Sequence, residues 1–281
     1  MKIGFVDHHL NNYHANKFLS LLRGELAELG AEVVSAWESD PTGDDWCAKN
    51  GVPRAESAIA VAQASDAVIV LAPDNIDAHL ALCREVFPAG KPTMVDKFLA
   101  PTLQEATLIQ EDAAQHGVKL FSASGLRFAV ELEAALANLN GAPTEAFARG
   151  MGQWEGYGVH TLSLLFGILG PNAVRVLDTG NATSACVTLD FGTTRGWVEV
   201  RAAENQWESF PWQFGFRVGE RYVTDTVKDF DGFYANLMRR AVHFFKTGES
   251  PVTSQEMLNI VAVLERARVS QAADGAWQTL D

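Results

Sequence analysis

The sequence predicts an α/β fold in which a Rossmann-like, doubly wound parallel sheet is followed by an α+β domain with a mainly antiparallel open sheet. In residues 1–123, short apolar runs alternate with amphipathic stretches, as in a parallel sheet crossed by helices. After residue 124, strand-like runs follow one another through turns that are too short for a parallel crossover. We therefore expect two domains, residues 1–123 and residues 124–281.

Each expected element of the first domain is an apolar or amphipathic run bounded by turn residues. Helices are expected to end at Gly30 and Gly117, because glycine commonly follows the last helical turn. The expected strands are 2–6, 31–36, 66–71, 93–95 and 118–122, and the expected helices are 13–29, 77–87 and 103–116.

The second domain is expected to contain more strands than helices. Its short turns, such as residues 191–194, predict antiparallel neighbours. The expected strands are 173–179, 185–191, 195–202, 213–218 and 221–227, and the expected helices are 129–139, 157–169, 233–246 and 254–272.

Composition excludes several classes of protein. The chain has 281 residues, 47% apolar and 20% charged, which is typical of a folded globular protein. With 22 Lys plus Arg against 35 Asp plus Glu, the net charge of −13 disfavours nucleic acid and anionic membranes as partners. The three cysteines form no C-x-x-C pair, and no apolar run reaches the ~18 residues of a membrane span. We expect a cytoplasmic protein that binds a small-molecule substrate.

In an open parallel sheet, ligands bind at the carboxyl ends of the strands, where the strand order reverses. The segment after the first strand lacks the G-x-G-x-x-G pattern of dinucleotide-binding proteins, but a helix amino terminus still binds phosphate. Adjacent histidines at positions 8 and 9 are expected to point in different directions, so we expect no metal site; His14 is expected to pack at the helix start. The cofactor contacts expected here are Asp7, His8, Leu10 and Asn11.

Two further strand ends carry polar residues. Glu38 follows the second strand, where an acidic residue commonly accepts hydrogen bonds from the ribose of NAD; a solvated surface acid is the alternative. No arginine directly follows Glu38, which favours NAD over NADP. Pro73 and Asn75 lie in the turn after the third strand and are expected to contact the nicotinamide ribose.

A lysine and a histidine are the candidates for acid–base chemistry. Asp96 and Lys97 stand together at the end of the fourth strand, although a lone lysine is usually a solvated charge. His160 opens an apolar helix after the glycine-rich residues 150–158, where a packed core histidine is the alternative. A lysine and a histidine brought together from two domains form a proton-handling pair for a secondary alcohol.

Three separated segments have the order and spacing of one known family. Residues 90–100, Gly-Lys-Pro-Thr-Met-Val-Asp-Lys-Phe-Leu-Ala, are similar to its G-K-P-x-x-x-E-K-P-x-A segment, and Gly158-Val159-His160 to its G-x-H element. Residues 247–270 are similar to its closing helix, and His14-Ala15 and Leu126-Arg127-Phe128 match smaller features. The chain therefore resembles the Gfo/Idh/MocA oxidoreductases, the family of glucose–fructose oxidoreductase and inositol dehydrogenase.

The resemblance implies hydride transfer between a nicotinamide cofactor, NAD or NADP, and a sugar, cyclitol or related hydroxy compound. It implies that Lys97 binds the substrate hydroxyl and assists the loss of its proton, and that His160 is the general acid/base. Two other functions stay open: a non-redox enzyme that holds NAD tightly, as in glycoside cleavage by transient oxidation, and a non-catalytic sensor or scaffold that has lost the cofactor.

The chain departs from the family around the candidate histidine. Gly156 and Ser163 stand where two aspartates are usual, so we expect Glu155 to take over the carboxylate role of position 156. Tyr157 and Arg127 are expected to contact the substrate, with a structural salt bridge as the alternative for Arg127. Further departures are Asp96 for glutamate, Phe98 for proline and the loss of the glycine pattern.

An aromatic run lies in the second domain: Trp197, Trp207, Phe210, Trp212, Phe214 and Phe216. The alternate residues Trp212, Phe214 and Phe216 share one face of a strand, which favours a core or an interface. Because family members commonly join subunits through the open face of this sheet, we expect a homodimer or homotetramer contact here. A platform for sugar rings is the alternative.

Overall fold

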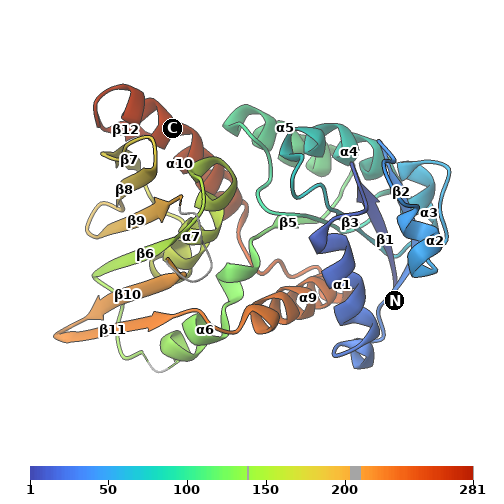
Figure 1. Ribbon diagram of the computed structural model, residues 1–281, viewed down its shortest axis with the longest axis horizontal. Helices are drawn as coiled ribbons and strands as arrows, with labels where there is room; N and C mark the ends of the chain where they lie inside the picture. The colour runs from blue at the N-terminus through green and yellow to red at the C-terminus, as the bar shows by residue number, and fades with distance from the viewer. Residues whose placement is uncertain (138, 203–209, 281) are drawn as a thin grey trace. The chain divides into compact units, whose positions relative to one another are not determined.

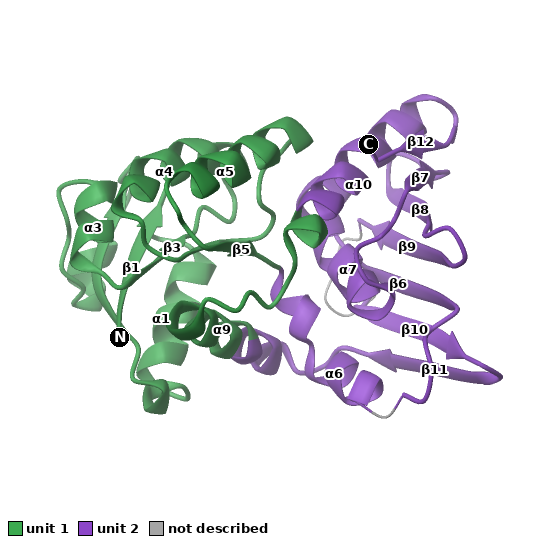
Figure 2. Cartoon of the chain, turned by 180° about the vertical axis from the view of Figure 1, so that it is seen from behind, with its two compact units in different colours: residues 1–123, 237–257 green, residues 124–236, 258–281 purple. Residues whose placement is uncertain are grey.

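The computed structural model describes residues 1–137, 139–202 and 210–280, which form two compact units (Figure 2). Unit 1 comprises residues 1–123 and 237–257, and unit 2 comprises residues 124–236 and 258–281. The second unit is therefore not continuous in sequence, because Leu237–Met257 packs with the first.

Unit 1 contains the parallel five-stranded sheet that the sequence predicted, and its strand order is β2-β1-β3-β4-β5 (Figure 1). The strand order reverses between β1 and β3, so the chain leaves these two strands toward opposite sides and opens a crevice at their carboxyl ends. The strands are β1 (Lys2–Asp7), β2 (Glu32–Glu38), β3 (Ala67–Val70), β4 (Thr93–Val95) and β5 (Leu120–Ser122).

The helices of unit 1 differ from expectation in two places. The helix expected over residues 13–29 stops at Arg23, where Gly24 caps it, and a short 3-10 turn, Ala27–Leu29, completes the segment. Two short helices between β2 and β3 were not predicted, because five and seven residues give too little periodicity to detect. The helices are α1 (Tyr13–Arg23), α2 (Trp46–Asn50), α3 (Ala58–Ala64), α4 (His79–Val86), α5 (Leu103–Gln115) and the last part of α9 (Phe230–Thr247).

Unit 2 contains a seven-stranded sheet in the order β11-β10-β6-β9-β8-β7-β12. The pairings are antiparallel except that β6 runs parallel to β9. The strand β6 was missed in the sequence because small residues alternate along it and a glycine-rich segment follows. The strands are β6 (Glu145–Met151), β7 (Arg175–Asp178), β8 (Ser184–Asp190), β9 (Arg195–Arg201), β10 (Gln213–Val218), β11 (Arg221–Thr226) and β12 (Gln278–Thr279).

Among its described residues, unit 2 also contains helices α6 (Val130–Ala137) and α7 (Trp154–Leu169), the first part of α9, and most of α10 (Ser254–Ala272). The apolar helix α7 packs on one face of the sheet, and Gly196 of β9 leaves room there for Leu165 and Leu169. The glycines at 156 and 158 lie within α7, so only the first part of the glycine-rich segment forms a bend.

The aromatic run divides between the two faces of this sheet. Trp212, Phe214 and Phe216 are at most 3% exposed and belong to the core of unit 2, so the expectation that they join subunits is wrong. Trp197 is 40% exposed and stacks on Phe147 at a centroid distance of 5.7 Å. Trp207, which the prediction also included, lies outside the described residues, and Phe210 is buried.

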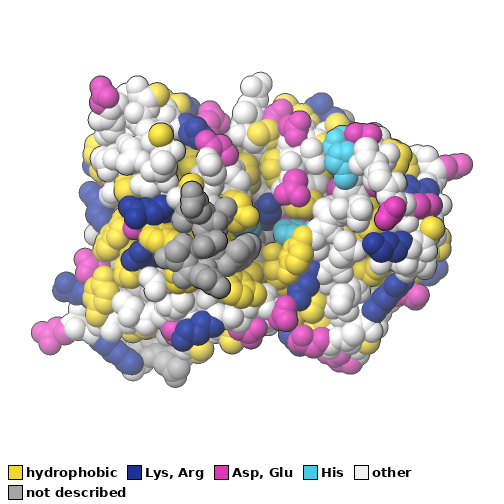
Figure 3. Space-filling view, viewed as in Figure 1, with side chains coloured by type: hydrophobic (Ala, Val, Ile, Leu, Met, Phe, Trp, Pro, Cys, Tyr) yellow, Lys and Arg dark blue, Asp and Glu magenta, His cyan; other side chains and the backbone are white. Residues whose placement is uncertain are grey.

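The surface carries mixed charge. On the face seen in Figure 3, acidic side chains are scattered over both units rather than gathered in one patch. Among the described residues, no helix is both long and apolar enough to cross a membrane.

Two glycines of α7 provide a matched test of its packing. A Cβ at Gly158 would lie 2.8 Å from Leu264 and from the Trp154 ring, whereas a Cβ at Gly156 would meet nothing within 4 Å. We expect Gly158→Ala to lower the free energy of unfolding by about 1–3 kcal/mol through overpacking. Gly156→Ala is expected to raise it by about 0.5–1 kcal/mol, because alanine favours the helix. Urea denaturation measures both, and a change of the same sign in the two variants would contradict this packing.

Candidate functional site

The carboxyl group of Asp7 ties together two loops at the crevice of unit 1. Its Oδ1 accepts hydrogen bonds from the N–H of Ala72 at 2.9 Å and of His9 at 3.2 Å, and its Oδ2 accepts one from the Asn12 side chain at 2.8 Å. Burial raises the pKa of Asp7 to about 7, although these hydrogen bonds act in the opposite direction. The shape of this glycine-free loop is therefore fixed by a buried carboxyl group.

Glu38 lies at the end of β2 and is almost fully buried. Its Oε2 accepts a hydrogen bond from the N–H of Leu10 at 2.7 Å, and its Oε1 accepts one from the Arg54 guanidinium at 2.8 Å. Arg54 also contacts Asp45. Glu38 is thus neither a solvated surface acid nor an open carboxylate. The side chain of Leu10 is buried in the core and that of Asn11 is exposed.

Sequence reasoning missed Arg54, because it follows Glu38 by 16 residues rather than directly. An isolated β-bridge between Ala36 and Arg54 brings it alongside β2. No local pattern in the sequence signals such a bridge.

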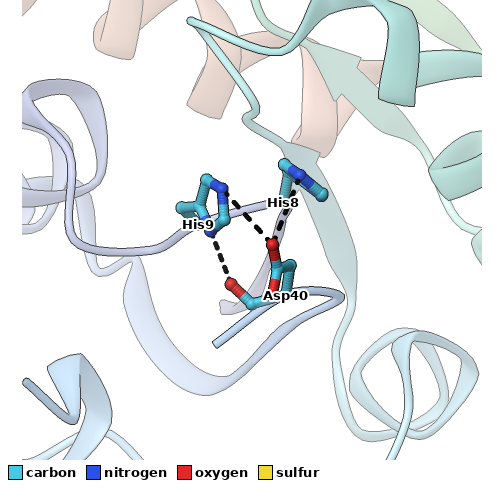
Figure 4. A group of neighbouring side chains, drawn as sticks. All are labelled: His8, His9 and Asp40. Atoms are coloured by element: carbon cyan, nitrogen blue, oxygen red, sulfur yellow. Dashed lines mark hydrogen bonds and ion pairs between the residues drawn. The ribbon is translucent and has the colours of Figure 1, made fainter. Parts of the chain in front are cut away.

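His8 and His9 do not point in different directions (Figure 4). Their ring centroids are 4.2 Å apart, and both rings face the carboxylate of Asp40. The expectation of divergent side chains is wrong because the alternation of an extended strand ends at Asp7, the last residue of β1.

Asp96 and Lys97 follow β4. Asp96 is fully buried and accepts hydrogen bonds from His14 Nδ1 and, at 2.8 Å, from the N–H of Lys97. Burial opposes the ionisation of Asp96, but the charge and hydrogen bond of His14, together with Lys97, hold its pKa below the ordinary value. His14 is therefore more than the packing residue that the sequence predicted, since it is the buried partner of a carboxylate.

The Lys97 side chain lies against the turn after β3. It is 9% exposed, and its Nζ donates a hydrogen bond to the carbonyl oxygen of Pro73 at 2.9 Å. The buried His79 contacts the carbonyl oxygens of Leu71 and Leu99 at 2.9 and 3.1 Å, which joins this turn to the segment after Lys97. Lys97 is thus a positioned amine and not a solvated charge; Asn75, in the same turn, is half-buried.

In unit 2, His160 lies on α7 and is half-buried. Its Nδ1 is 2.7 Å from Ser124 Oγ, which also accepts a hydrogen bond from the N–H of Leu126. The rings of Tyr157 and Trp212 meet the His160 ring edge-on, each at a centroid distance of 5.6 Å. Ser124, which the sequence analysis did not single out, therefore orients the candidate histidine.

The remaining candidates of unit 2 lie apart from one another. Glu155 is exposed, forms an ion pair with Arg268 and lines a polar pocket of about 160 Å³ with Asp178 and Asn181. It precedes His160 by five residues, which places it on a different side of α7. Arg127 lies beside Gly167 of the same helix and over the ring of Phe128.

The structure therefore brings together two separate sets of predicted residues. In unit 1, Asp7, Glu38, Pro73, Asp96 and Lys97 all lie at the carboxyl ends of the parallel strands. In unit 2, His160 and Tyr157 lie together on α7, next to Trp212.

Comparison with known proteins identifies the fold. Residues 3–124 match the model of an oxidoreductase family with an NAD-binding Rossmann fold, GFO_IDH_MocA. No curated protein matches the sequence.

Solved structures match over the whole chain. A dehydrogenase described as probable, from Thermotoga maritima, is 16% identical with a TM-score of 0.83, covering 100% of this chain and 99% of its own. GenD2 from gentamicin A biosynthesis, in complex with NAD, is 16% identical (TM-score 0.81, coverage 100% and 96%). The myo-inositol 2-dehydrogenase from Lactobacillus plantarum is 13% identical (TM-score 0.80, coverage 100% and 99%). At such identities these likenesses establish the fold alone.

The buried pair of Asp96 and His14 gives a prediction about stability. Asp96→Asn is expected to lower the free energy of unfolding at pH 7 by about 3 kcal/mol, because it removes the charge that faces His14 in a buried site. The folded-state pKa of Asp96 lies below its ordinary value of 3.8, so the contribution is complete above that pH and is lost as the pH falls through the folded-state pKa. Urea denaturation at pH 7 and at several pH values below 4 should show that the difference in unfolding free energy between the variant and wild type shrinks as the pH falls.

Asp112→Asn is the matched control, because Asp112 pairs with Arg84 at 2.8 Å on the surface. It is expected to cost less than about 1 kcal/mol. Equal losses in the two variants at pH 7 would contradict a special role for the buried pair.

Proposed function

Residues 3–124 belong to the Gfo/Idh/MocA oxidoreductase family, and from this premise we propose that the protein is a nicotinamide-dependent dehydrogenase or reductase of a sugar, cyclitol or related hydroxy compound. The family is NAD-binding, and a fold neighbour was crystallised with NAD. The observation that carries the proposal is the placement of Lys97, a nearly buried amine fixed at the carboxyl end of β4.

The residues at this crevice fit a dinucleotide. A carboxylate oxygen can accept two hydrogen bonds, and each Glu38 oxygen accepts one, from Leu10 or from Arg54, so Glu38 has capacity left for the hydroxyls of the adenosine ribose. Pro73 and Asn75 would contact the nicotinamide ribose, next to Asp96. The start of α1 and the loop residues His8 and Asn11 would hold the pyrophosphate, and the buried Asp7 would contribute by fixing the shape of this loop.

When bound, the cofactor supplies a carbon that accepts or gives a hydride, which no side chain does. Lys97 donates hydrogen bonds to the substrate hydroxyl; its contact with Pro73 uses one of three ammonium donors. His160 takes the hydroxyl proton during oxidation and returns it during reduction, with Ser124 fixing the orientation of its ring. Tyr157 and Arg127 contact the other oxygens of the substrate, and Trp212 keeps water from His160.

The choice between NAD and NADP depends on Arg54. NAD is the favoured cofactor in this proposal, because Glu38 stands where an acid accepts the ribose hydroxyls of NAD. Arg54 supports the alternative, since an arginine near this acid accommodates the additional phosphate of NADP.

We also propose that the protein forms a homodimer or homotetramer through the exposed face of the sheet in unit 2. Since Trp212, Phe214 and Phe216 are core residues, this contact is assigned to Trp197 and Phe147 on the exposed face.

The proposed roles of Lys97 and His160 are tested by substitution. We expect Lys97→Ala and His160→Ala each to lower kcat/KM by about 10²–10⁴-fold, the usual loss when a positioned proton donor or acceptor is removed. The assay is a screen of polyols and sugars with NAD(H) and NADP(H), on protein stripped of nucleotide, followed by steady-state kinetics on any substrate found.

Lys91→Ala is the matched control, because Lys91 lies in the turn before β4, where its backbone oxygen accepts a hydrogen bond from the Thr93 hydroxyl and is kept in the variant. Unchanged kcat/KM in Lys97→Ala would contradict the proposal. Mass spectrometry of denatured protein separates the rival functions: a nucleotide that resists stripping supports non-redox chemistry with a held cofactor, and no binding of any nucleotide supports a sensor or scaffold.

Arg54→Ala tests the cofactor assignment. Because the variant removes a cation beside Glu38, we expect the affinity ratio of NAD to NADP to rise by about tenfold or more, the effect of one charge-assisted hydrogen bond of about 1.5 kcal/mol. Isothermal titration calorimetry with both nucleotides measures the ratio. Arg23→Ala is the control, because among the described residues Arg23 donates a hydrogen bond to the Asn50 carbonyl oxygen and none to Glu38. An unchanged ratio in Arg54→Ala would remove Arg54 from the cofactor site.

A further inference from the structure

We propose that His8, His9 and Asp40 form a binding site for a divalent transition-metal ion, with Zn²⁺ as its representative. One ligand atom from each of the three residues lies within 4.8 Å of the others, and Figure 4 shows both imidazole rings facing the same carboxylate. This site goes beyond the proposed oxidoreductase activity and does not depend on it.

The backbone holds the three residues in place before any ion binds. Backbone pairing between the segments of β1 and β2 continues past the ends of both strands. The N–H of Ser39 donates a hydrogen bond to the backbone oxygen of Asp7, and the N–H of Asp40 donates one to the backbone oxygen of His8, each at 3.0 Å. His8 and Asp40 are thereby fixed side by side although 32 positions separate them. A preformed arrangement of ligands reduces the ordering that metal binding requires.

Hydrogen bonds to the other ring nitrogen prepare the imidazoles as ligands. His9 Nδ1 lies 2.5 Å from the backbone oxygen of Asp40, and because a carbonyl only accepts, this nitrogen carries the hydrogen. The lone pair of neutral His9 is therefore on Nε2, which faces the carboxylate. His8 Nδ1 lies 2.8 Å from Ser39 Oγ, so the Nε2 of His8 also faces the Asp40 carboxylate. Metal-binding histidines typically show this arrangement of outer contacts.

The spacing of the ligand atoms suits a shared ion better than direct hydrogen bonds. Nε2 of His8 and of His9 lie 4.0 and 3.8 Å from Asp40 Oδ2, beyond the normal hydrogen-bond range of about 2.7–3.2 Å. Two ligands on a tetrahedral Zn²⁺ are about 3.4 Å apart, given bonds of about 2.1 Å. Side-chain rotations that shorten these separations would complete the site.

The donor set selects the class of metal. Imidazole nitrogens favour Zn²⁺, Cu²⁺, Ni²⁺ and Fe²⁺, whereas Mg²⁺ and Ca²⁺ require mainly oxygen ligands. The histidines are about one-third exposed and Asp40 is more than half exposed, so water completes the coordination. Three protein ligands with an open position are typical of exchangeable or catalytic metal sites rather than closed structural ones.

Titration with the metal alone tests the site. Tag-free protein is treated with a chelator, dialysed and titrated with ZnCl₂ or MgCl₂ by calorimetry, with no nucleotide present. We expect one Zn²⁺ per chain and no comparable heat from Mg²⁺. His9→Ala and Asp40→Asn are each expected to weaken Zn²⁺ binding by about tenfold or more. The visible spectrum of bound Co²⁺ provides a second readout, which the same variants should abolish.

His116→Ala is the matched control, since His116 is an exposed histidine at the end of α5, away from the cluster in sequence and fold. Circular dichroism establishes that each variant is folded. The proposal is overturned if Zn²⁺ does not bind to wild type, if Mg²⁺ binds as tightly as Zn²⁺, or if His9→Ala and Asp40→Asn bind Zn²⁺ as tightly as His116→Ala does. Because no cofactor or substrate takes part, these outcomes are independent of the dehydrogenase assays.

Discussion

Three buried carboxyl groups hold together the edge of unit 1 at which the parallel strands end. A buried carboxylate must be matched by hydrogen-bond donors, since leaving it without them costs several kcal/mol. Asp7, Glu38 and Asp96 each take donors from a different segment: the loop after β3, the loop before α1, and α1 itself. In most Rossmann folds the first loop is shaped by glycines that let the backbone approach a phosphate. In this protein the shape of the first loop is fixed by the hydrogen bonds that these buried carboxyl groups accept from it.

This constraint explains why Lys97 is well positioned although its loop has diverged from the family pattern. Asp96 fixes the backbone N–H of Lys97, and His14 of α1 holds Asp96 in turn. The carbonyl of Pro73, in the turn that Asp7 also anchors through Ala72, then receives the Lys97 side chain. The position of one amine thus depends on contacts from β1, the turn after β3, and α1, which are distant in sequence.

The fold could be predicted from the sequence where a local pattern decides the structure. β10 and α10 have the expected limits, because each is a long run with one periodicity and clear ends. β6 could not be predicted, because its small residues carry little hydrophobic signal and its partners, β9 and β10, lie more than 40 residues away. The short α2 and α3 also escaped, since tertiary packing rather than propensity stabilises so few residues.

The candidate site likewise contains residues that could be predicted from the local sequence and contacts that could not. Lys97 and His160 could be proposed from the sequence because of their residue types, the strand end before Lys97, and the resemblance to the family; their catalytic roles stay predictions. Their supports, the His14 contact to Asp96 and the Ser124 contact to His160, join residues 82 and 36 positions apart, and no periodicity encodes such pairs. The convergence of His8 and His9 on Asp40 was missed for a related reason: the rule of alternating side chains applies within a strand and stops at its end.

The net negative charge of the chain makes the local charges at this edge important for the proposed binding of a dinucleotide. A protein with a net charge of −13 repels an anionic dinucleotide at long range, so binding depends on local groups at the crevice. Burial raises the pKa of Asp7 to about 7, which reduces the negative charge of the first loop near neutral pH. Arg54 offsets the negative charge of Glu38 at the end of β2, and Lys97 carries positive charge at the end of β4. A cation on His8, His9 and Asp40 would add more at the end of β1. Under the proposed function, paired carboxylates and positive groups at this edge would do what glycines and a bare helix terminus do in the usual dinucleotide site.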